Sequence, residues 1–195
     1  PIEETLSALT DLVRRGLVRY IGCSNFSAWR LMQALWASDK GGYERFVSIQ
    51  PEYSLVAPIR QNFEAEISKV CLAYGVGVIP WSPLSGGLLG GVLGDSDRAR
   101  RQSPQSLKRI DKLRPQLEQW EKLCADLSEE PAAVALAWLL AQDGVTCPII
   151  GPRTREQLDG ASLRSLDITL EPDTLTSIDA IFPGPGGTAP EAYAW

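Results

Sequence analysis

Residues 81–87 have the types and the spacing of a nucleotide-binding segment. They read Trp-Ser-Pro-Leu-Ser-Gly-Gly and directly follow the apolar run 76–80. A strand that ends in an aromatic ring, a hydroxyl group and a glycine-rich turn presents a flat face and several backbone N–H groups. We therefore expect a nucleotide cofactor to bind at this strand end.

The chain contains no histidine. This absence excludes Ser-His and Cys-His nucleophile pairs, imidazole metal ligands and the usual acid–base group of neutral pH. Any chemistry must therefore come from other side chains or from a bound group, and we predict no metal site.

Composition and charge narrow the class of protein. A chain of 195 residues that is 44% hydrophobic and 22% charged suits a single domain with a sizeable core. The net charge is −5, and the basic cluster 98–101 lacks interleaved aromatic residues, so we expect no nucleic-acid partner. That cluster is either a solvated loop or a phosphate clamp. No apolar run approaches the ~20 residues of a membrane helix, so we expect no membrane partner.

Four cysteines occur singly in apolar segments, with neither CxxC spacing nor a signal peptide before them. We expect them to be reduced and buried, and the protein to be cytoplasmic. They are Cys23, Cys71, Cys124 and Cys147.

Helical and strand patterns alternate along the chain. Apolar runs predict strands at 18–22, 46–50, 76–81 and 146–151. Helical periodicity and terminal signals predict helices that begin at Pro1 and Ser27, run over 63–74, 115–127 and 131–142, and begin again at Thr154 and Pro172. The Gly- and Ser-rich residues 82–106 are too long for an ordinary strand–helix loop, and we expect them to cover the cofactor. Residues 183–195 form a Gly- and Pro-rich tail.

Four strands separated by helices, each strand buried on both faces, predict a parallel α/β sheet. A doubly wound sheet is one alternative, but its GxGxxG signature is absent. Polar residues instead follow the carboxyl ends of all four strands, which is where (β/α)₈ barrels build their active sites.

The chain resembles the aldo-keto reductase family through four motifs in order. They are 16–26 (GLVRYIGCSNF) for the fifth strand, 50–53 (QPEY) for the sixth, 81–84 (WSPL) for the seventh, and 150–153 (IGPR) with Gln157 for the eighth. The resemblance covers essentially the whole chain. It implies a TIM barrel of which residues 1–195 form the second half, strands five to eight, as one domain. It also implies NADPH-dependent reduction of aldehydes or ketones to alcohols.

The resemblance assigns roles to individual residues. Ser24, Asn25 and Gln50 would hydrogen-bond the nicotinamide carboxamide, although the first two could also form a strand-ending turn or a helix N-cap. Trp81 would stack on the nicotinamide ring, the alternative being a core aromatic residue. The backbone amides of Ser82, Leu84, Gly86 and Leu88 would bind the pyrophosphate, with Pro83 fixing the turn.

Gly151, in the eighth-strand motif, would also bind the cofactor. Arg153 and Arg155 lie at a helix start that suits a 2′-phosphate, so we expect NADPH/NADP⁺ in preference to NAD. Gln157 would either contact the cofactor or form a capping box with Thr154. Two departures from the family pattern affect this end. Val92 stands where a lysine is common, and Gly160 and Ala161 stand where a Glu-Asn pair is common, so a loop arginine such as Arg101 could substitute.

The resemblance places the catalytic Asp, Tyr, Lys and His on the first four strands, ahead of Pro1. No catalytic residue is therefore assigned in this chain, whose five tyrosines match other positions, and the chain alone is expected to be inactive. The expected partners are a small carbonyl substrate and either a second copy or the missing amino-terminal half, because the sheet edges would be unpaired. The alternative is a non-catalytic NADPH-binding or regulatory half-barrel module, like the channel-associated members of the family.

Overall fold

The computed structural model describes residues 1–94 and 103–186. In its first part, strands alternate with helical segments, and one helix between β2 and β3 is divided into three pieces. The elements are α1 (Ile2–Arg14), β1 (Ile21–Ser24), α2 (Ala28–Gly41), β2 (Phe46–Gln50), α3 (Ile59–Asn62), the π-helix η1 (Phe63–Ile67), α4 (Ser68–Tyr74) and β3 (Gly77–Val78).

The second part is helical. A 3₁₀ turn follows β3, and two long helices and several short helical segments come after it. They are η2 (Ser85–Gly87), α5 (Pro104–Asp126), α6 (Pro131–Leu140), α7 (Arg155–Gln157), the π-helix η4 (Leu158–Leu163), the 3₁₀ turn η5 (Arg164–Leu166) and α8 (Pro172–Ile181).

The three strands form one parallel sheet in the order β1-β2-β3, which confirms the α/β class. The segment after α6 continues this order, because Val145 forms a parallel bridge with Val78 and Ile149 N donates to Pro80 O at 2.7 Å. Each strand thus lies beside the next one along the chain. Over the described ranges the strand order does not reverse as it does in a doubly wound sheet.

Several predicted strands are shorter or absent. The first runs over Ile21–Ser24 rather than 18–22, and the third covers only Gly77–Val78, with a separate bridge from Trp81 to Glu52. The expected strand at 146–151 is not a strand, since that segment pairs with the sheet along one side by scattered hydrogen bonds. Burial on both faces was also wrong, because a sheet of three short strands leaves Val47 44% exposed.

The helix predictions are closer to the structure. Glu3 and Glu4 lie in the first turn of α1, where they face the positive end of the helix dipole, and Gly75 ends α4 with φ +65°. Ser27 is the N-cap residue of α2, although its side chain makes no capping hydrogen bond.

The helix predicted at 115–127 begins eleven residues earlier, at Pro104. Ser103 caps it by accepting a hydrogen bond from Ser106 N at 3.1 Å, and Pro115 lies inside the helix. The segment after β3 therefore ends at Ser103 rather than at 106, and its residues 95–102 lie outside the described residues. Of the tail 183–195, residues 183–186 form neither helix nor strand, and 187–195 are not described.

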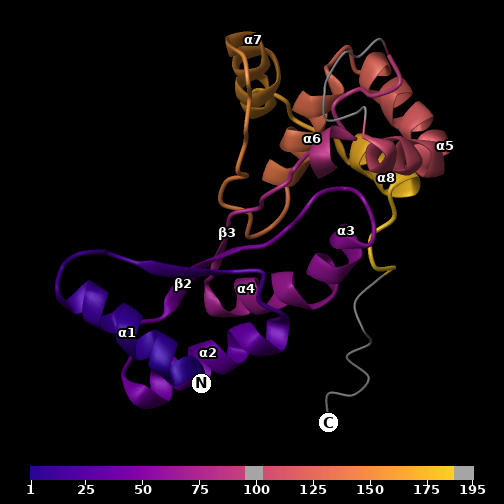
Figure 1. Cartoon of the computed structure of the whole chain (residues 1–195). Coiled ribbons are helices and arrows are strands. Elements are labelled where there is room, and N and C mark those ends of the chain that lie inside the picture. The colour runs from indigo at the N-terminus through magenta and orange to yellow at the C-terminus, as the bar shows by residue number, and fades with distance from the viewer. Residues whose placement is uncertain (95–102, 187–195) are drawn as a thin grey trace.

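The helices fall into two groups in Figure 1, with α1 and α2 below the strands and α5, α6 and α8 together at the upper right. Helices α1 and α2 pack on β1 and β2 around a small core that includes Leu6 and Phe46. A larger core joins the sheet to α5, α6 and α8, and it buries Trp120 and Trp138. Residues 132–139 of α6 are all buried, as its apolar sequence predicted. This central helix therefore fixes the position of the segments on either side of it.

All four cysteines are free, but they are not all buried. Cys71 and Cys124 are buried, Cys23 is partly buried, and Cys147 is exposed. The prediction for Cys147 was wrong because its segment lies at the edge of the sheet. Within residues 1–94 and 103–186, no helix is both long and apolar enough to cross a membrane.

Candidate cofactor site

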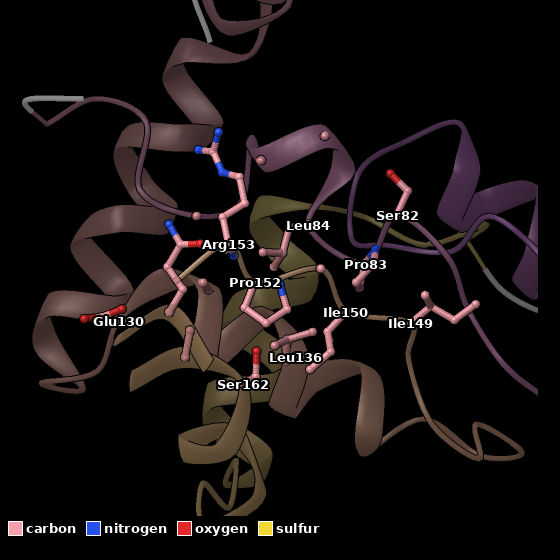
Figure 2. Close-up of a pocket in the computed structure, with 17 residues that line it drawn as sticks. Ser82, Pro83, Leu84, Glu130, Leu136, Ile149, Ile150, Pro152, Arg153 and Ser162 are labelled. Atoms are coloured by element: carbon pink, nitrogen blue, oxygen red, sulfur yellow. Dashed lines mark hydrogen bonds between the residues drawn. The ribbon is translucent and has the colours of Figure 1, made fainter. Parts of the chain in front are cut away.

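A pocket of about 370 Å³ lies beyond the carboxyl end of β3. It is bounded by the turn after β3, the start of α6, the segment 149–153 and the helical residues after it (Figure 2). Its volume falls in the range of small-molecule and cofactor sites. The lining residues are Ser82, Pro83, Leu84, Gly86, Gly87, Gly90, Glu130, Ala132, Leu136, Ile149, Ile150, Gly151, Pro152, Arg153, Gln157, Ala161 and Ser162.

Seven of the twelve residues predicted to bind a cofactor line this pocket. They are Ser82, Pro83, Leu84, Gly86, Gly151, Arg153 and Gln157. Of the other five, Leu88 is buried beside Val92 in a small core under the turn. The remaining four form a second group at the strand ends.

This group, the strand-end cluster, consists of Ser24, Asn25, Gln50 and Trp81. Ser24 Oγ donates to Gln50 O at 2.8 Å, and Asn25 N donates to the same oxygen at 3.2 Å. Trp81 Nε1 donates to Asn25 Oδ1 at 2.9 Å. The three strand ends are therefore tied together, and the cluster meets the pocket where Trp81 joins Ser82. Trp81 is partly buried.

The turn after β3 has an alternating pattern of backbone hydrogen bonds. Ser85 N donates to Ser82 O at 2.8 Å, and Gly87 N donates to Leu84 O at 2.9 Å. The N–H groups of Ser82, Leu84 and Gly86 donate no hydrogen bond within the part of the chain that the structure describes. Three amides of one turn are thus left for an acceptor such as a phosphate oxygen.

The backbone at the two groups is unusual. Asn25, Ser82 and Ser85 adopt φ of +55°, +57° and +50°, in the left-handed region that residues other than glycine rarely occupy. Such conformations cost free energy and often accompany binding sites. Gly87 has φ +97°, which a residue with a Cβ atom could adopt only under strain. The turn therefore has a backbone shape that depends on the contacts around it.

Helix α5 supplies those contacts. Glu121 Oε1 accepts hydrogen bonds from Val92 N at 2.5 Å and from Leu93 N at 2.9 Å. Trp120 Nε1 donates to Leu89 O at 3.3 Å, and Arg109 Nη2 donates to Ser85 Oγ at 3.0 Å. None of these supports was foreseen from the sequence.

Arg153 is the basic side chain among the residues that line the pocket. Its guanidinium forms no ion pair with any residue in the described ranges, and it is exposed. Arg155, by contrast, pairs with Asp159 at 3.3 Å and does not line the pocket. Of the two arginines expected near the 2′-phosphate, Arg153 therefore lines the pocket and Arg155 does not, while Arg101 lies outside the described residues.

Gln157 has the capping role that its spacing from Thr154 allowed. Gln157 N donates to Thr154 Oγ1 at 3.3 Å, and Gln157 Oε1 accepts from Arg153 N at 2.8 Å. The second bond fixes the backbone that carries Arg153. Because Gln157 also lines the pocket, its amide group remains close enough to contact a ligand.

The comparisons with known proteins bear on the whole chain. The model of the Aldo/keto reductase family matches residues 1–182. The chain belongs to the aldo/keto reductase family.

Two relatives illustrate the range of this family. The chain is 43% identical over 195 residues to an uncharacterized oxidoreductase, YrpG, of Bacillus subtilis, covering 100% of this chain and 58% of the relative. It is 29% identical to the versiconal hemiacetal acetate reductase of Aspergillus parasiticus, covering 94% of this chain and 56% of that protein. The chain therefore spans somewhat more than half the length of these relatives.

A third relative is named as a channel subunit rather than as an oxidoreductase or reductase. A putative voltage-gated potassium channel subunit beta of Schizosaccharomyces pombe is 29% identical, with 93% of this chain and 55% of that protein covered.

No tyrosine in the described part of this aldo/keto reductase chain lines the pocket. Tyr53 is buried, and its hydroxyl donates to Glu64 Oε1 at 2.7 Å. Burial and the neighbouring Glu64 carboxylate raise the pKa of Tyr53, so this hydroxyl is a poor proton donor. Tyr193 lies outside the described residues. That this chain contains no catalytic residue stays a prediction.

Two side chains at the far end of the pocket were missed by the sequence analysis. Glu130 and Ser162 line it, as does Ala161. Figure 2 shows Glu130 on the opposite side of the pocket from Ser82 and Ile149. Among the described residues no group of three or more metal-ligating side chains is present.

Proposed function

We propose that this chain is the cofactor-binding, carboxyl-terminal half of an NADPH-dependent aldo/keto reductase that reduces aldehydes or ketones to alcohols. The observation that most supports this proposal is the turn after β3. Three of its amides donate no hydrogen bond to any of the described residues 1–94 and 103–186, and the turn shares one pocket with the exposed guanidinium of Arg153. Such a combination suits a ligand with two separate anionic groups.

The residues fit the parts of NADPH in sequence. The amides of Ser82, Leu84 and Gly86 would receive the pyrophosphate, and Arg153 would bind the 2′-phosphate that distinguishes NADPH from NADH. Trp81 and Asn25 would hold the nicotinamide, whose ring supplies the hydride when the cofactor is bound. Because Trp81 Nε1 is already bonded to Asn25 Oδ1, the indole plane is fixed before a ring stacks on it.

The half-barrel assignment has its own support. The strands β1, β2 and β3 and the segment at Val145 lie side by side in chain order, as four consecutive positions of a (β/α)₈ barrel would. The chain spans 58% of the relative YrpG, so the remaining strands would supply the catalytic Asp, Tyr, Lys and His. We propose that this chain alone is inactive, that its substrate is a small carbonyl compound, and that the protein is cytoplasmic.

A spectrophotometric assay tests the proposal. The intact protein is mixed with NADPH and 4-nitrobenzaldehyde, and the loss of NADPH absorbance is followed against a control without aldehyde. We expect aldehyde-dependent oxidation that is slower with NADH. Saturable NADPH binding with no turnover of any of a panel of aldehydes and ketones would refute the reductase assignment.

That outcome would support a second candidate, a non-catalytic NADPH-binding or regulatory module. The observation that favours it is the 29% identity to a protein named as a potassium channel beta subunit. The two candidates share the pocket and differ in turnover, so the same assay separates them.

A further inference from the structure

We propose that Tyr53 and Glu64 are positioning residues for the nicotinamide end of the site, because they hold the backbone of Trp81 in place. The inference rests on the proposed function, in which Trp81 stacks on the nicotinamide ring, and it deepens that function. Neither Tyr53 nor Glu64 lines the pocket, so both would act through Trp81 rather than on the cofactor itself.

The backbone of Trp81 is attached to the segment that follows β2. Trp81 N donates to Pro51 O at 2.9 Å, and Tyr53 N donates to Trp81 O at 3.4 Å. Glu52, between these two residues, forms a parallel bridge with Trp81. The contact from Trp81 Nε1 to Asn25 Oδ1 fixes the ring but not the backbone. The position of Trp81 therefore depends on the position of residues 51–53.

Tyr53 is the residue of that segment whose side chain is anchored in the core. Its ring packs against Phe63 and Trp138, with centroids 4.2 and 5.5 Å away. Its hydroxyl donates to Glu64 Oε1 at 2.7 Å. Tyr53 is 1% exposed, so water has little access to the hydroxyl if this acceptor is lost. Apolar packing is not directional, whereas the hydrogen bond at the tip of the ring sets how far the side chain reaches.

Glu64 can act as a fixed acceptor because it is itself fixed. Its Oε1 also accepts from Arg60 Nε at 2.8 Å. Arg60 in turn donates to Asp179 Oδ1 at 2.6 Å and to the carbonyl oxygen of Phe182. Glu64 Oε2 lies 2.8 Å from the place where a Cβ atom would stand on Gly184, so the chain after α8 passes close to this oxygen. The carboxylate is thus anchored to α8 and to the residues that follow it.

This arrangement should act on one part of the cofactor. A stacked ring is stabilised only while the two rings stay offset and in contact, so a shift of Trp81 costs stacking free energy. The turn after Trp81 has separate contacts with α5, through Ser85 and Leu89. Loss of the bond between Tyr53 and Glu64 should therefore weaken binding of the nicotinamide and leave binding of the phosphates unchanged.

The test compares two ligands that differ only in the nicotinamide. NADPH and 2′-phospho-ADP-ribose are titrated onto the intact protein by isothermal titration calorimetry. In Tyr53→Phe, which keeps the ring, we expect NADPH to bind about five-fold more weakly and 2′-phospho-ADP-ribose to bind as before. Glu64→Ala should give the same pattern. Glu64→Gln, which keeps an acceptor, should recover most of the affinity for NADPH.

Tyr74→Phe is the matched control. Tyr74 is exposed at the end of α4, and its hydroxyl forms no hydrogen bond with any residue in the described ranges. This variant should change neither affinity. A merely structural role for Tyr53 and Glu64 would weaken both ligands alike in the two removal variants. That result, or unchanged binding of both ligands, would overturn the inference while leaving the proposed site intact. Failure of the natural protein to bind either ligand would overturn the proposed function as well.

Discussion

Glu121 is the carboxylate through which α5 holds residues 92 and 93, which follow the turn that we propose for the pyrophosphate, so its replacement tests whether the shape of the turn matters for binding. Glu121 Oε1 accepts from Val92 N and Leu93 N, at 2.5 and 2.9 Å. Val92 is 8% exposed, so its amide has little access to water when the carboxylate is removed. In Glu121→Ala both amides lose their acceptor, and the segment after the turn loses one of its three ties to α5 among the described residues, while Arg109–Ser85 and Trp120–Leu89 remain.

The magnitude follows from the two bonds. A hydrogen bond to a charged group contributes about 1.5–3 kcal/mol, and a buried amide without a partner costs about 1–3 kcal/mol. Because Glu121 is partly exposed and both bonds share one oxygen, we expect Glu121→Ala to lower the free energy of unfolding by about 2–3 kcal/mol. Glu121→Gln keeps a neutral acceptor and should lose about half as much. A loosened turn should weaken NADPH binding about ten-fold in the alanine variant.

The assay pairs urea unfolding with NADPH titration for each variant. Glu118→Ala is the control, because Glu118 is exposed one turn earlier on the same helix. It should change neither quantity. If Glu121→Ala matched Glu118→Ala in both measurements, the hydrogen bonds of Glu121 would contribute neither to stability nor to NADPH binding. If stability fell while NADPH affinity stayed the same, the turn would not be part of the cofactor site.

Three further predictions concern groups away from the turn. Arg60 is 6% exposed and pairs with Glu64 at 2.8 Å and with Asp179 at 2.6 Å. Arg60→Ala should lower the free energy of unfolding in urea by about 3–5 kcal/mol, because it leaves the carboxylates without their partner. A decrease below about 1 kcal/mol would contradict this prediction. Asn25→Ala removes the acceptor of Trp81 Nε1 and should weaken NADPH binding about five-fold in a fluorescence titration. Unchanged affinity would mean that the strand-end cluster does not take part in NADPH binding. Burial raises the pKa of Cys124 from 9.0 to about 12, so the folded state keeps the neutral thiol. The free energy of unfolding should therefore fall as the pH rises from about 9 toward 12, by up to about 1.4 kcal/mol per pH unit for this group. Cys124→Ala should show a shallower fall in urea unfolding at pH 8, 9 and 10, and identical slopes would refute the assignment.

Local signals in the sequence predicted the parts of the site that lie on one short segment each. Ser82, Leu84 and Gly86 were expected from the strand end and the glycine turn, and the structure places all three at the pocket. The strand-end cluster was also expected, because parallel strands bring their carboxyl ends to one edge. The hydrogen bonds within it were not, since they join residues as far apart as Asn25 and Trp81.

The supports of the turn could not be predicted for a specific reason. Pro115 favoured a helix start at that residue, so the residues before it, Arg109 among them, were not expected to face the turn. In the structure Ser103 caps a helix that runs through Pro115. Packing against the core at Ile110 and Leu117 compensates for the proline. A tertiary contact thus outweighed a local signal.

The presence of Glu130 in the pocket could not be predicted from the sequence for another reason. Glu130 stands before a proline at a helix start, where a charged side chain is ordinary. Glu130 lines the pocket because the fold brings the start of α6 beside the segment 149–153, which no local signal indicates. The expected strand at 146–151 failed because its apolar residues Ile149 and Ile150 form the pocket wall instead of a buried strand.

The central claim is that the pocket binds NADPH through Arg153, and an equilibrium titration tests it most directly. NADPH and NADH are titrated onto the intact protein and onto Arg153→Ala by tryptophan fluorescence. One guanidinium–phosphate contact predicts that the natural protein binds NADPH about ten-fold more tightly than NADH, and that the variant binds both alike. If NADPH shows no saturable binding, or if Arg153→Ala keeps the full preference for NADPH, the account is contradicted.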